Sequence, residues 1–345
     1  MGVALNQVEQ AAVQAECGEA NGLPNRFYVS PRAASYERDT LLANTWTCVG
    51  YASDVAPSSA RPFKLLGLPL VMVKDAVGTM RVFHNVCRHR GHKLVGEACP
   101  IKNVLRCPYH SWAYGADGAL VATPHVGGPG VHETPGLDRS QKGLFAVASH
   151  VWMDMVFINL SGNAEAFETH IAPLEKRWAR FTSPHGLAQA RPAATHGRMQ
   201  FTLACNWKLA VENYCESYHL PWVHPGLNSY SRIEDHYNIL AGNWGAGQGT
   251  TVFDFSNRAG ISLPRFSGWP ETLEKTAEYI ALFPNVLLGI QNDHFYSIVL
   301  TPRTAGKTHE DVQIYYVADA AEGAHYDAAR HTVLEGWREV FLEDV

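Results

Sequence analysis

Two short clusters of cysteine and histidine constrain this chain more than any other feature. The first holds Cys87 and His89 in a Cys-x-His pair, and the second holds Cys107 and His110 in a Cys-x-x-His pair. Each pair offers one thiolate and one imidazole from a single tight turn. Two such turns that face each other make a four-ligand metal site.

Three interpretations of these clusters compete. Buried cysteines are often only small apolar side chains, but four ligand-type residues in two clusters disfavour that reading. A structural zinc site also uses two cysteines and two histidines. Zinc fingers usually take two cysteines from one half and two histidines from the other, whereas each half here is mixed. A [2Fe–2S] cluster with both cysteines on one iron and both histidines on the other suits mixed halves.

The residues around the two pairs resemble the Rieske signature. They are Arg90 and Gly91 after the first pair, Pro108 and Tyr109 inside the second, and Trp112 just after it. The resemblance implies a Rieske [2Fe–2S] cluster held by Cys87, His89, Cys107 and His110. His92 is interpreted as a residue near the cluster or on the surface, and not as a ligand.

A second group of metal-binding residue types follows in the C-terminal half. Glu216, His219 and His224 have a Glu-x2-His-x4-His spacing. Residues 207–219 contain no Gly or Pro, which predicts a helix on which Glu216 and His219 share a face. Prolines beyond His219 end this helix, so His224 can bend back toward His219. Two imidazoles and one carboxylate are the ligands of non-haem Fe(II) oxygenases, which keep positions open for O2.

Seventeen histidines in the chain make one histidine pair a weak signal, and histidines near a helix end are often ordinary surface or core residues. The neighbouring residues strengthen the interpretation: Asn206-Trp207-Lys208, then Glu212-Asn213, then Glu216-Ser217-Tyr218-His219, all downstream of the Rieske-like motif. With both motifs in this order, the chain resembles the α subunits of Rieske non-haem iron oxygenases over nearly its whole length.

The resemblance implies roles for individual residues. Glu216 matches a carboxylate that links an iron-binding histidine to a Rieske histidine of a neighbouring subunit, and Glu212 and Asn213 are further catalytic candidates. Most members have Asp at position 216, and Glu is similar to members that oxidise quaternary ammonium compounds such as carnitine. The third iron ligand implied is Asp344, next to Glu343 near the C-terminus. The alternative for that pair is a plain acidic helix end.

The expected fold class is α+β, with an antiparallel β Rieske domain and a helix-grip catalytic domain in which helices cover an antiparallel sheet. The expected domains are an N-terminal helical segment at 1–44 that packs on the catalytic domain, the Rieske domain at 45–160 and the catalytic domain at 161–345.

Periodicity and turn residues predict the individual elements. In the first half these are helices at 1–25 and 35–46, strands at 46–51, 65–74, 80–85 and 150–159, a hairpin turn at 114–118 and a loop at 123–137. In the second half they are a helix at 164–182, strands at 199–203, 250–255, 281–289, 295–302 and 312–317, and a final helix at 327–344 with Leu334, Trp337 and Phe341 on one side.

Composition excludes several function classes. A net charge of −5 gives no support for binding nucleic acid or an anionic membrane. No run of eighteen apolar residues predicts a membrane span, and no secretory signal is visible. Apart from the two cluster cysteines, the remaining five (Cys17, Cys48, Cys99, Cys205 and Cys215) are expected to be reduced thiols in a cytoplasmic protein.

The resemblance implies a terminal oxygenase that uses O2 and the electrons of NAD(P)H. No Gly-x-Gly-x-x-Gly motif is present, so the flavin and iron–sulfur reductase must be another polypeptide. A homotrimer is implied, because electrons cross between subunits in the family. A Rieske electron carrier without oxygenase activity is an alternative of a different class.

Two substrate classes remain open: a quaternary or methylated amine, and an aromatic acid or hydrocarbon for mono- or dioxygenation. A cation favours surrounding ring faces, although aromatic side chains are also common in cores. The candidate substrate-binding residues are Tyr214, Tyr218, Trp222, Phe253, Phe255 and Phe295. The Gly-rich residues 240–270 are predicted to lie at the entrance of the substrate site.

Overall fold

A computed structural model describes residues 3–16, 18–65, 67–102, 104–182, 187–255, 260 and 262–344. The chain divides into two compact units. One unit joins Met1–Leu42 to Glu165–Val345, and the other is Ala43–Ala164. The N-terminal segment therefore belongs to the same unit as the C-terminal half of the chain.

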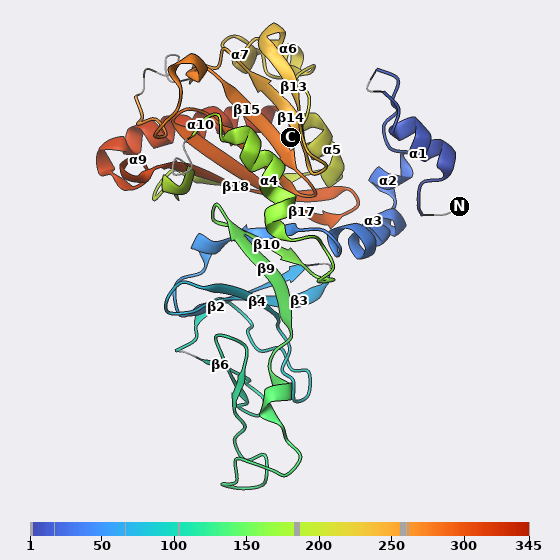
Figure 1. Ribbon diagram of the computed structural model, residues 1–345, viewed down its shortest axis with the longest axis vertical. Helices are drawn as coiled ribbons and strands as arrows, with labels where there is room; N and C mark the ends of the chain where they lie inside the picture. Colours follow the sequence, from blue (N-terminus) through green and yellow to red (C-terminus); the bar gives the residue numbers. More distant parts are fainter. Residues whose placement is uncertain are drawn as a thin grey trace. The chain divides into compact units, whose positions relative to one another are not determined.

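The unit Ala43–Ala164 is built from antiparallel strands (Figure 1). Its larger sheet has the order β1-β10-β9-β4-β3-β2-β5, and a three-stranded sheet has the order β6-β7-β8. The strands are β1 (Thr47–Tyr51), β2 (Ser59–Leu65), β3 (Leu68–Lys74), β4 (Met80–His84), β5 (Cys99–Pro100), β6 (Val104–Arg106), β7 (Ala113–Gly115), β8 (Leu120–Ala122), β9 (Ala146–Trp152) and β10 (Met155–Asn159).

The stretch at 150–159, predicted as a single strand, is a hairpin. Residues 150–159 turn back at Met153 and Asp154, where φ is 48° and 71°, and β9 pairs with β10. Neither turn residue is Gly, so the usual sequence signal of a tight turn is missing. The predicted strand at 65–74 is confirmed over Leu68–Lys74 as β3, while Leu65 is the last residue of β2 and pairs with Leu68.

The other unit contains an eight-stranded antiparallel sheet of order β11-β18-β17-β16-β15-β14-β13, with β12 also paired to β18. The strands are β11 (Ala190–Pro192), β12 (Arg198–Leu203), β13 (His236–Ala241), β14 (Gly245–Thr250), β15 (Ala277–Leu282), β16 (Val286–Ile290), β17 (His294–Thr304) and β18 (Lys307–Val317). The helices are α1 (Gln7–Val13), α2 (Arg26–Val29), α3 (Pro31–Glu37), α4 (Phe167–Trp178), α5 (Trp207–Tyr214), α6 (Leu220–Val223), α7 (Pro225–Asn228), α9 (Ala318–Glu322) and α10 (Asp327–Glu343). The predicted α+β class is confirmed.

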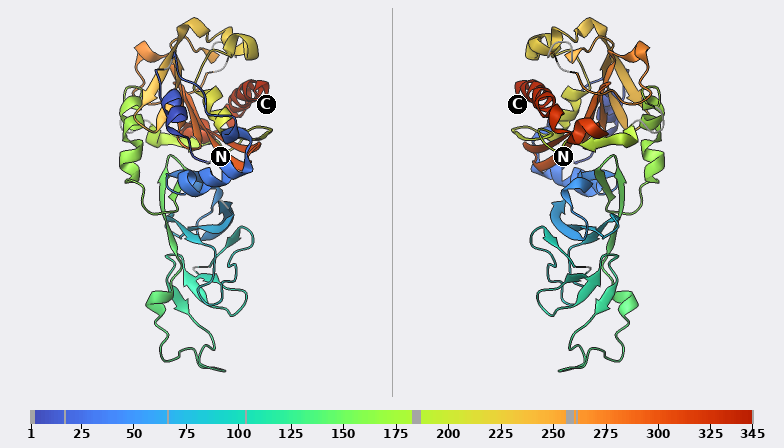
Figure 2. Two further views of the ribbon diagram at one scale, coloured as in Figure 1. Left: turned by 90° about the vertical axis from the view of Figure 1, so that its right-hand side faces the viewer. Right: turned by 90° about the vertical axis from the view of Figure 1, so that its left-hand side faces the viewer.

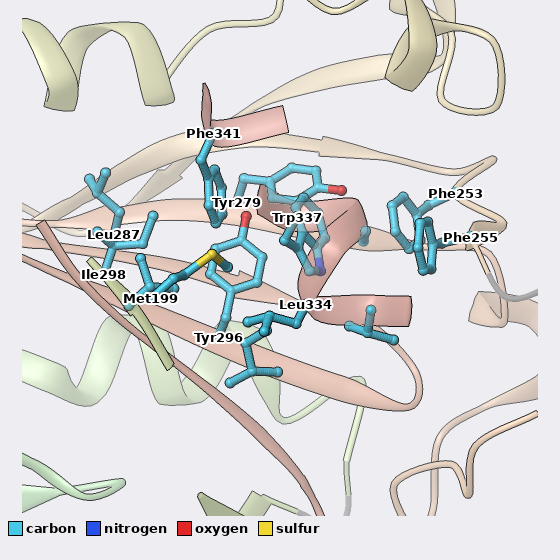
Figure 3. Close-up of a cluster of buried hydrophobic side chains, with 14 of the residues drawn as sticks. Met199, Phe253, Phe255, Tyr279, Leu287, Tyr296, Ile298, Leu334, Trp337 and Phe341 are labelled. Atoms are coloured by element: carbon cyan, nitrogen blue, oxygen red, sulfur yellow. The ribbon is translucent and has the colours of Figure 1, made fainter. Parts of the chain in front are cut away.

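Helices lie on both faces of this sheet, as Figure 2 shows for α4 and α10. Alternate residues of β15 show why. Tyr279 points toward α10, where it packs against Trp337, while Glu278 points to the other face and binds Arg177 of α4. The α10 face holds the main core cluster, in which Trp337 and Phe341 pack against Tyr296 of β17 (Figure 3).

The N-terminal segment is anchored on α5 by polar contacts. Lys208 Nζ contacts the Glu37 carboxylate at 2.8 Å, and both side chains are buried. Tyr28 Oη donates to the Glu212 carboxylate at 2.7 Å. The predicted helix at 1–25 is shorter than expected, since α1 covers Gln7–Val13 behind an Asn6 capping box.

The observed strands differ from several further predictions. The strand predicted at 250–255 is displaced, because β14 covers Gly245–Thr250. Strand β13 at His236–Ala241 was not predicted. The stretch 281–289 is part of the β15–β16 hairpin and not one strand. Among the described residues, no helix combines the length and the apolar character needed to cross a membrane.

Candidate metal centres

The two Cys/His loops have the same backbone hydrogen bonding. Gly91 N–H donates to Cys87 O at 3.0 Å, and the equivalent Ser111 N–H donates to Cys107 O at 3.0 Å. Both Gly91 and Ser111 have left-handed backbone conformations, with φ of 72° and 57°. Gly91 adopts this conformation without the strain that a Cβ adds. The sequence therefore builds two copies of one tight turn, each with a Cys at its start and a His inside.

Like ligands lie next to like ligands across the two loops. Burial raises the pKa of the Cys87 thiol, and the neighbouring Cys107 thiol contributes to this rise. The His89 and His110 rings pack edge to face, with centroids 4.6 Å apart. A single tetrahedral ion would gather all four ligands, whereas a [2Fe–2S] cluster with one all-sulfur and one all-nitrogen iron needs this pairing.

The two histidines of this site present ring nitrogens that suit metal ligands. His89 Nδ1 and His110 Nδ1 are buried and have no hydrogen-bond partner within the described residues. Buried polar atoms are rarely left unpaired unless an ion or a water completes them. The His89 ring is held by stacking on Trp112, at a centroid distance of 4.7 Å. Burial and the neighbouring His110 lower the pKa of His89, which favours the neutral, metal-binding form.

Tyr114 makes a polar contact with the sulfur end of this site. Its hydroxyl lies 3.2 Å from Cys87 Sγ and accepts a hydrogen bond from Arg88 N–H at 3.0 Å. The hydroxyl proton is thus free to point at the sulfur, where it would stabilise a thiolate. His92 is exposed, and its Nδ1 contacts the carbonyl of Lys93 at 2.7 Å.

A second group of ligand-type side chains lies in the other unit. His219, His224 and Asp344 bring one ligand atom each within 4.8 Å of one another. His224 Nε2 is 3.1 Å from Asp344 Oδ1, and the two histidine rings pack edge to face. Two imidazoles and one carboxylate in open array suit a non-haem Fe(II) ion.

The helix that precedes these histidines is shorter than predicted. It ends at Tyr214 and not at residue 219, and a separate short helix, α6, begins after His219. Tertiary contacts explain the early end. Gln248 Nε2 donates to Glu216 O at 3.1 Å, and Tyr218 N–H donates to the Glu216 carboxylate. Backbone groups that pair with side chains in this way are withdrawn from the helix ladder.

Each histidine of this group has a carboxylate on its Nδ1. Glu216 Oε1 lies 2.5 Å from His219 Nδ1, and Glu343 Oε2 lies 2.8 Å from His224 Nδ1. A carboxylate on one ring nitrogen fixes the tautomer and leaves the other nitrogen for a metal. Burial lowers the pKa of His224, but the Asp344 and Glu343 carboxylates outweigh burial and raise it overall.

Glu343 was not predicted as a site residue. Its position directly before Asp344 was noted, but adjacent residues near a helix end do not normally share one target. α10 ends at Glu343 and Asp344 is its C-cap, and the two carboxylates contact different nitrogens of the His224 ring.

The candidate substrate and catalytic residues occupy different places. Tyr214 belongs to the α10-side core, where its hydroxyl donates to Tyr296 Oη at 3.0 Å. Phe253 and Phe255 are also buried there. Phe295 is on the opposite face of the sheet, stacked on Tyr315, so the structure does not bring it to the metal group.

Four further candidates lie outside that core. Tyr218 and Trp222 are 78% and 76% exposed. Glu212 accepts the Tyr28 hydrogen bond and so anchors the N-terminal segment. Asn213 lies on the last turn of α5, and its carbonyl accepts from Glu216 N–H at 3.4 Å. Of the predicted entrance segment 240–270, residues 256–259 and 261 lie outside the described residues.

Comparison with known proteins decides the family. The Rieske [2Fe-2S] domain matches residues 45–135, and the ring hydroxylating alpha subunit (catalytic domain) matches residues 190–345. The glycine betaine monooxygenase oxygenase subunit of Pseudomonas aeruginosa is 30% identical over 345 aligned residues, covering 89% of this chain and 76% of that relative. The chain belongs to the Rieske oxygenase α subunits.

Other relatives of this oxygenase agree. The carnitine monooxygenase oxygenase subunit of Escherichia coli (strain K12) is 29% identical over 262 residues, covering 74% of this chain and 67% of the relative. The solved structure of the quaternary ammonium Rieske monooxygenase CntA with L-carnitine has a TM-score of 0.72 at 23% identity, covering 93% of this chain and 81% of that one. Naphthalene 1,2-dioxygenase from Rhodococcus sp. has a TM-score of 0.69 at 18% identity, covering 92% and 81%. These two structures share its fold.

The predicted cofactors and enzyme class are confirmed. As a member of this family, the oxygenase uses a Rieske [2Fe–2S] cluster and a mononuclear iron, and both groups of side chains described above fit them. The electron-carrier alternative is excluded, because the catalytic domain of the family extends over residues 190–345. The relatives are named oxygenase subunits, a name that implies a separate component that supplies electrons.

Proposed function

We propose that this oxygenase hydroxylates or oxidatively demethylates a quaternary or methylated amine. Relatives named for carnitine, glycine betaine and choline support this substrate class. Glu216, whose carboxylate contacts His219 Nδ1, also supports this substrate class. A glutamate at this position resembles the family members that act on quaternary ammonium compounds.

We assign the cluster to Cys87, His89, Cys107 and His110, and the mononuclear iron to His219, His224 and Asp344. The assignment of the mononuclear iron rests chiefly on one observation. One ligand atom each of His219, His224 and Asp344 lies within 4.8 Å of the other two. When bound, the cluster supplies single electrons and the mononuclear iron activates O2.

The chain's own residues prepare these groups. Glu216 and Glu343 accept hydrogen bonds from the Nδ1–H groups of His219 and His224, so that Nε2 of each ring keeps its lone pair for the metal. The buried position of His224 keeps water away from this ligand. Around the cluster, the Trp112 ring orients His89, and the Tyr114 hydroxyl donates toward Cys87.

We further propose a homotrimer in which Glu216 connects His219 to a Rieske histidine of the next subunit. The Glu216 side chain is 44% exposed, and Tyr218 and Trp222 beside it are exposed aromatic residues of the kind enriched at interfaces. Tyr109, next to His110, is also exposed. The electrons would come from NAD(P)H through a separate flavin and iron–sulfur reductase.

A cytoplasmic location belongs to this proposal. Cys99, Cys205 and Cys215 are free thiols in the structure, which is consistent with a reducing compartment, and Cys17 lies outside the described residues.

An aromatic substrate is the second candidate. The α10-side core contains Phe253, Tyr279, Tyr296, Trp337 and Phe341, side chains that would also pack against an aromatic ring (Figure 3). The ring of an aromatic substrate is neutral. The two substrate classes therefore differ in whether the atom next to the oxidised carbon carries a positive charge.

A single turnover separates the two classes without the native reductase. The holoenzyme is reduced chemically, mixed with isotopically labelled O2, and offered choline, glycine betaine, L-carnitine or aromatic acids. The proposal expects labelled oxygen in the product of an amine, detected by mass spectrometry, and none with the His224→Ala variant. Labelled product from aromatic acids alone would overturn the amine assignment.

A further inference from the structure

The described residues include four buried carboxylates, and one of them lacks a partner. These are Glu37, Glu278, Asp293 and Glu310. Glu37 is held by Lys208, Glu278 by Arg177 and Arg180, and Asp293 by His294. Within the described part of the chain, the Glu310 carboxylate forms no hydrogen bond or ion pair, and the residue is only 7% exposed.

Glu310 lies in apolar surroundings on the α10 side of the sheet. It is on β18, between Phe201 of β12 and Leu300 of β17 as cross-strand partners. Val312 and Ile314, which point to the same side of β18, belong to the α10-side core. The Glu310 side chain therefore faces the helix that ends at Asp344.

An aromatic path connects Glu310 with the proposed iron site. The Phe201 ring packs edge to face against Phe341, with centroids 6.3 Å apart. Phe341 is one turn before Asp344 on α10, and it also packs against Tyr296 at 5.4 Å. Burial, and then the Asp344 carboxylate, raise the pKa of Glu310 to about 7.

A buried carboxylate without a partner is unfavourable for folding. Such a group is expected where a ligand supplies the missing partner. The carboxylates of Glu216 and Glu343 are already engaged by histidine N–H groups. Among the described residues, Glu310 is a carboxyl group on the Asp344 side of the sheet that no protein cation or hydrogen-bond donor engages.

We propose that Glu310 is the counter-ion for the positively charged nitrogen of the substrate, a proposal that rests on the amine-oxidising function above. A quaternary ammonium group has no N–H to donate, so it can be recognised only by charge and by ring faces. Glu310 supplies the charge, and Phe201, Phe341 and Tyr296 supply the rings. Glu310 thereby makes the site prefer a cation over a neutral group of equal size.

The test compares choline with its carbon isostere, in which a quaternary carbon replaces the nitrogen. Binding of each to the anaerobic holoenzyme is measured by calorimetry, and the ratio of the two dissociation constants is the cation preference. In Glu310→Gln we expect this preference to fall about tenfold or more, because a desolvated charge contact is lost. Binding of the isostere and the iron content should stay as in the wild type.

Asp311→Asn is the matched control. Asp311 is the next residue on β18, points away from the core and binds Arg198 at 2.6 Å, so its loss removes an equal charge from the opposite face. We expect this variant, and Glu310→Asp, which keeps the charge, to retain the cation preference.

Each outcome has one meaning. A wild type without cation preference overturns the amine function and this proposal with it. A wild type that prefers the cation, with an unchanged preference in Glu310→Gln, overturns the role of Glu310 alone. If Glu310→Gln fails to fold, the charge is structural, which also overturns the proposal, since removing an unpaired buried charge should leave the thermal midpoint unchanged or raise it.

Discussion

Glu343 Oε2 lies 2.8 Å from His224 Nδ1, while the next residue, Asp344, lies 3.1 Å from Nε2 of the same ring. Two adjacent residues at the end of α10 thus contact both nitrogens of one imidazole. Only one of these contacts can be replaced by a metal without loss of the ring's orientation. The geometry assigns the ligand position to Asp344 and the orienting position to Glu343.

Replacing Glu343 should therefore weaken the mononuclear iron site. In Glu343→Ala the His224 ring loses its orienting acceptor, and we expect iron affinity at this site to fall about 10- to 100-fold. Iron titration of the apo site, with the Rieske absorbance as an internal reference, measures the change. Glu335→Ala, an exposed glutamate on the same helix, is the control. Equal iron affinity in both variants would contradict the role.

Glu216→Gln should keep both metals and slow turnover strongly. The amide can still accept from His219, but it loses the charge that the proposed contact with the neighbouring Rieske histidine requires. Steady-state turnover with a saturating reductase, next to iron content, tests this. Glu216→Asp is the control and should retain part of the activity. Wild-type turnover in Glu216→Gln would show that the bridge is wrongly assigned.

The buried ion pairs of Glu278 with Arg177 and Arg180 should contribute strongly to stability. Glu278 is fully buried, and it receives hydrogen bonds from Arg177 at 2.6 Å and 2.9 Å, from Arg180, and from Tyr237 at 3.1 Å. Glu278→Gln leaves two arginines without their anion, and we expect a loss of roughly 3 kcal/mol in the free energy of unfolding. Urea unfolding measures it. Glu310→Gln should show no such loss, and an equal loss in both variants would be contrary to expectation.

His170 should make the protein less stable in mild acid. Burial lowers the pKa of this imidazole, which packs against Phe167 and Trp244 and has an unpaired Nε2. The unfolded chain then binds a proton more readily than the folded one. Its contribution is therefore complete above the ordinary imidazole pKa of 6.5 and is lost as the pH falls below that value toward the lowered one.

The corresponding variant is His170→Phe, which keeps an aromatic ring but cannot bind a proton. We expect its urea midpoint to fall less than that of the wild type as the pH is lowered through the imidazole range. Exposed His331→Asn serves as the control and should follow the wild type. Parallel pH dependence in all three proteins would refute the role of His170.

The two groups of ligand-type side chains were predictable because most of their members are close in sequence. Cys87 and His89 lie in one turn, as do Cys107 and His110, so spacing alone determines what each turn presents. His219 and His224 are likewise close together, and the resemblance supplied Asp344. The strand pattern of β17 and the apolar stripe of α10 were also readable from periodicity.

What sequence reasoning missed depends on distant contacts. The early end of α5 follows from the Gln248 contact with the carbonyl of Glu216, and nothing in residues 207–219 announces it. The turn at Met153 and Asp154 lacks Gly. Glu310 reads as an ordinary polar residue in an alternating strand, and only the structure shows that its carboxylate is buried without a cation.

Metal analysis of the anaerobically purified protein tests the central claim most directly. The account predicts about three iron atoms per chain with a Rieske-type absorbance, two in the cluster and one at the mononuclear site. It also predicts about two in Asp344→Ala with the same absorbance. A wild type with two irons per chain, or with zinc in place of the cluster iron, would contradict it.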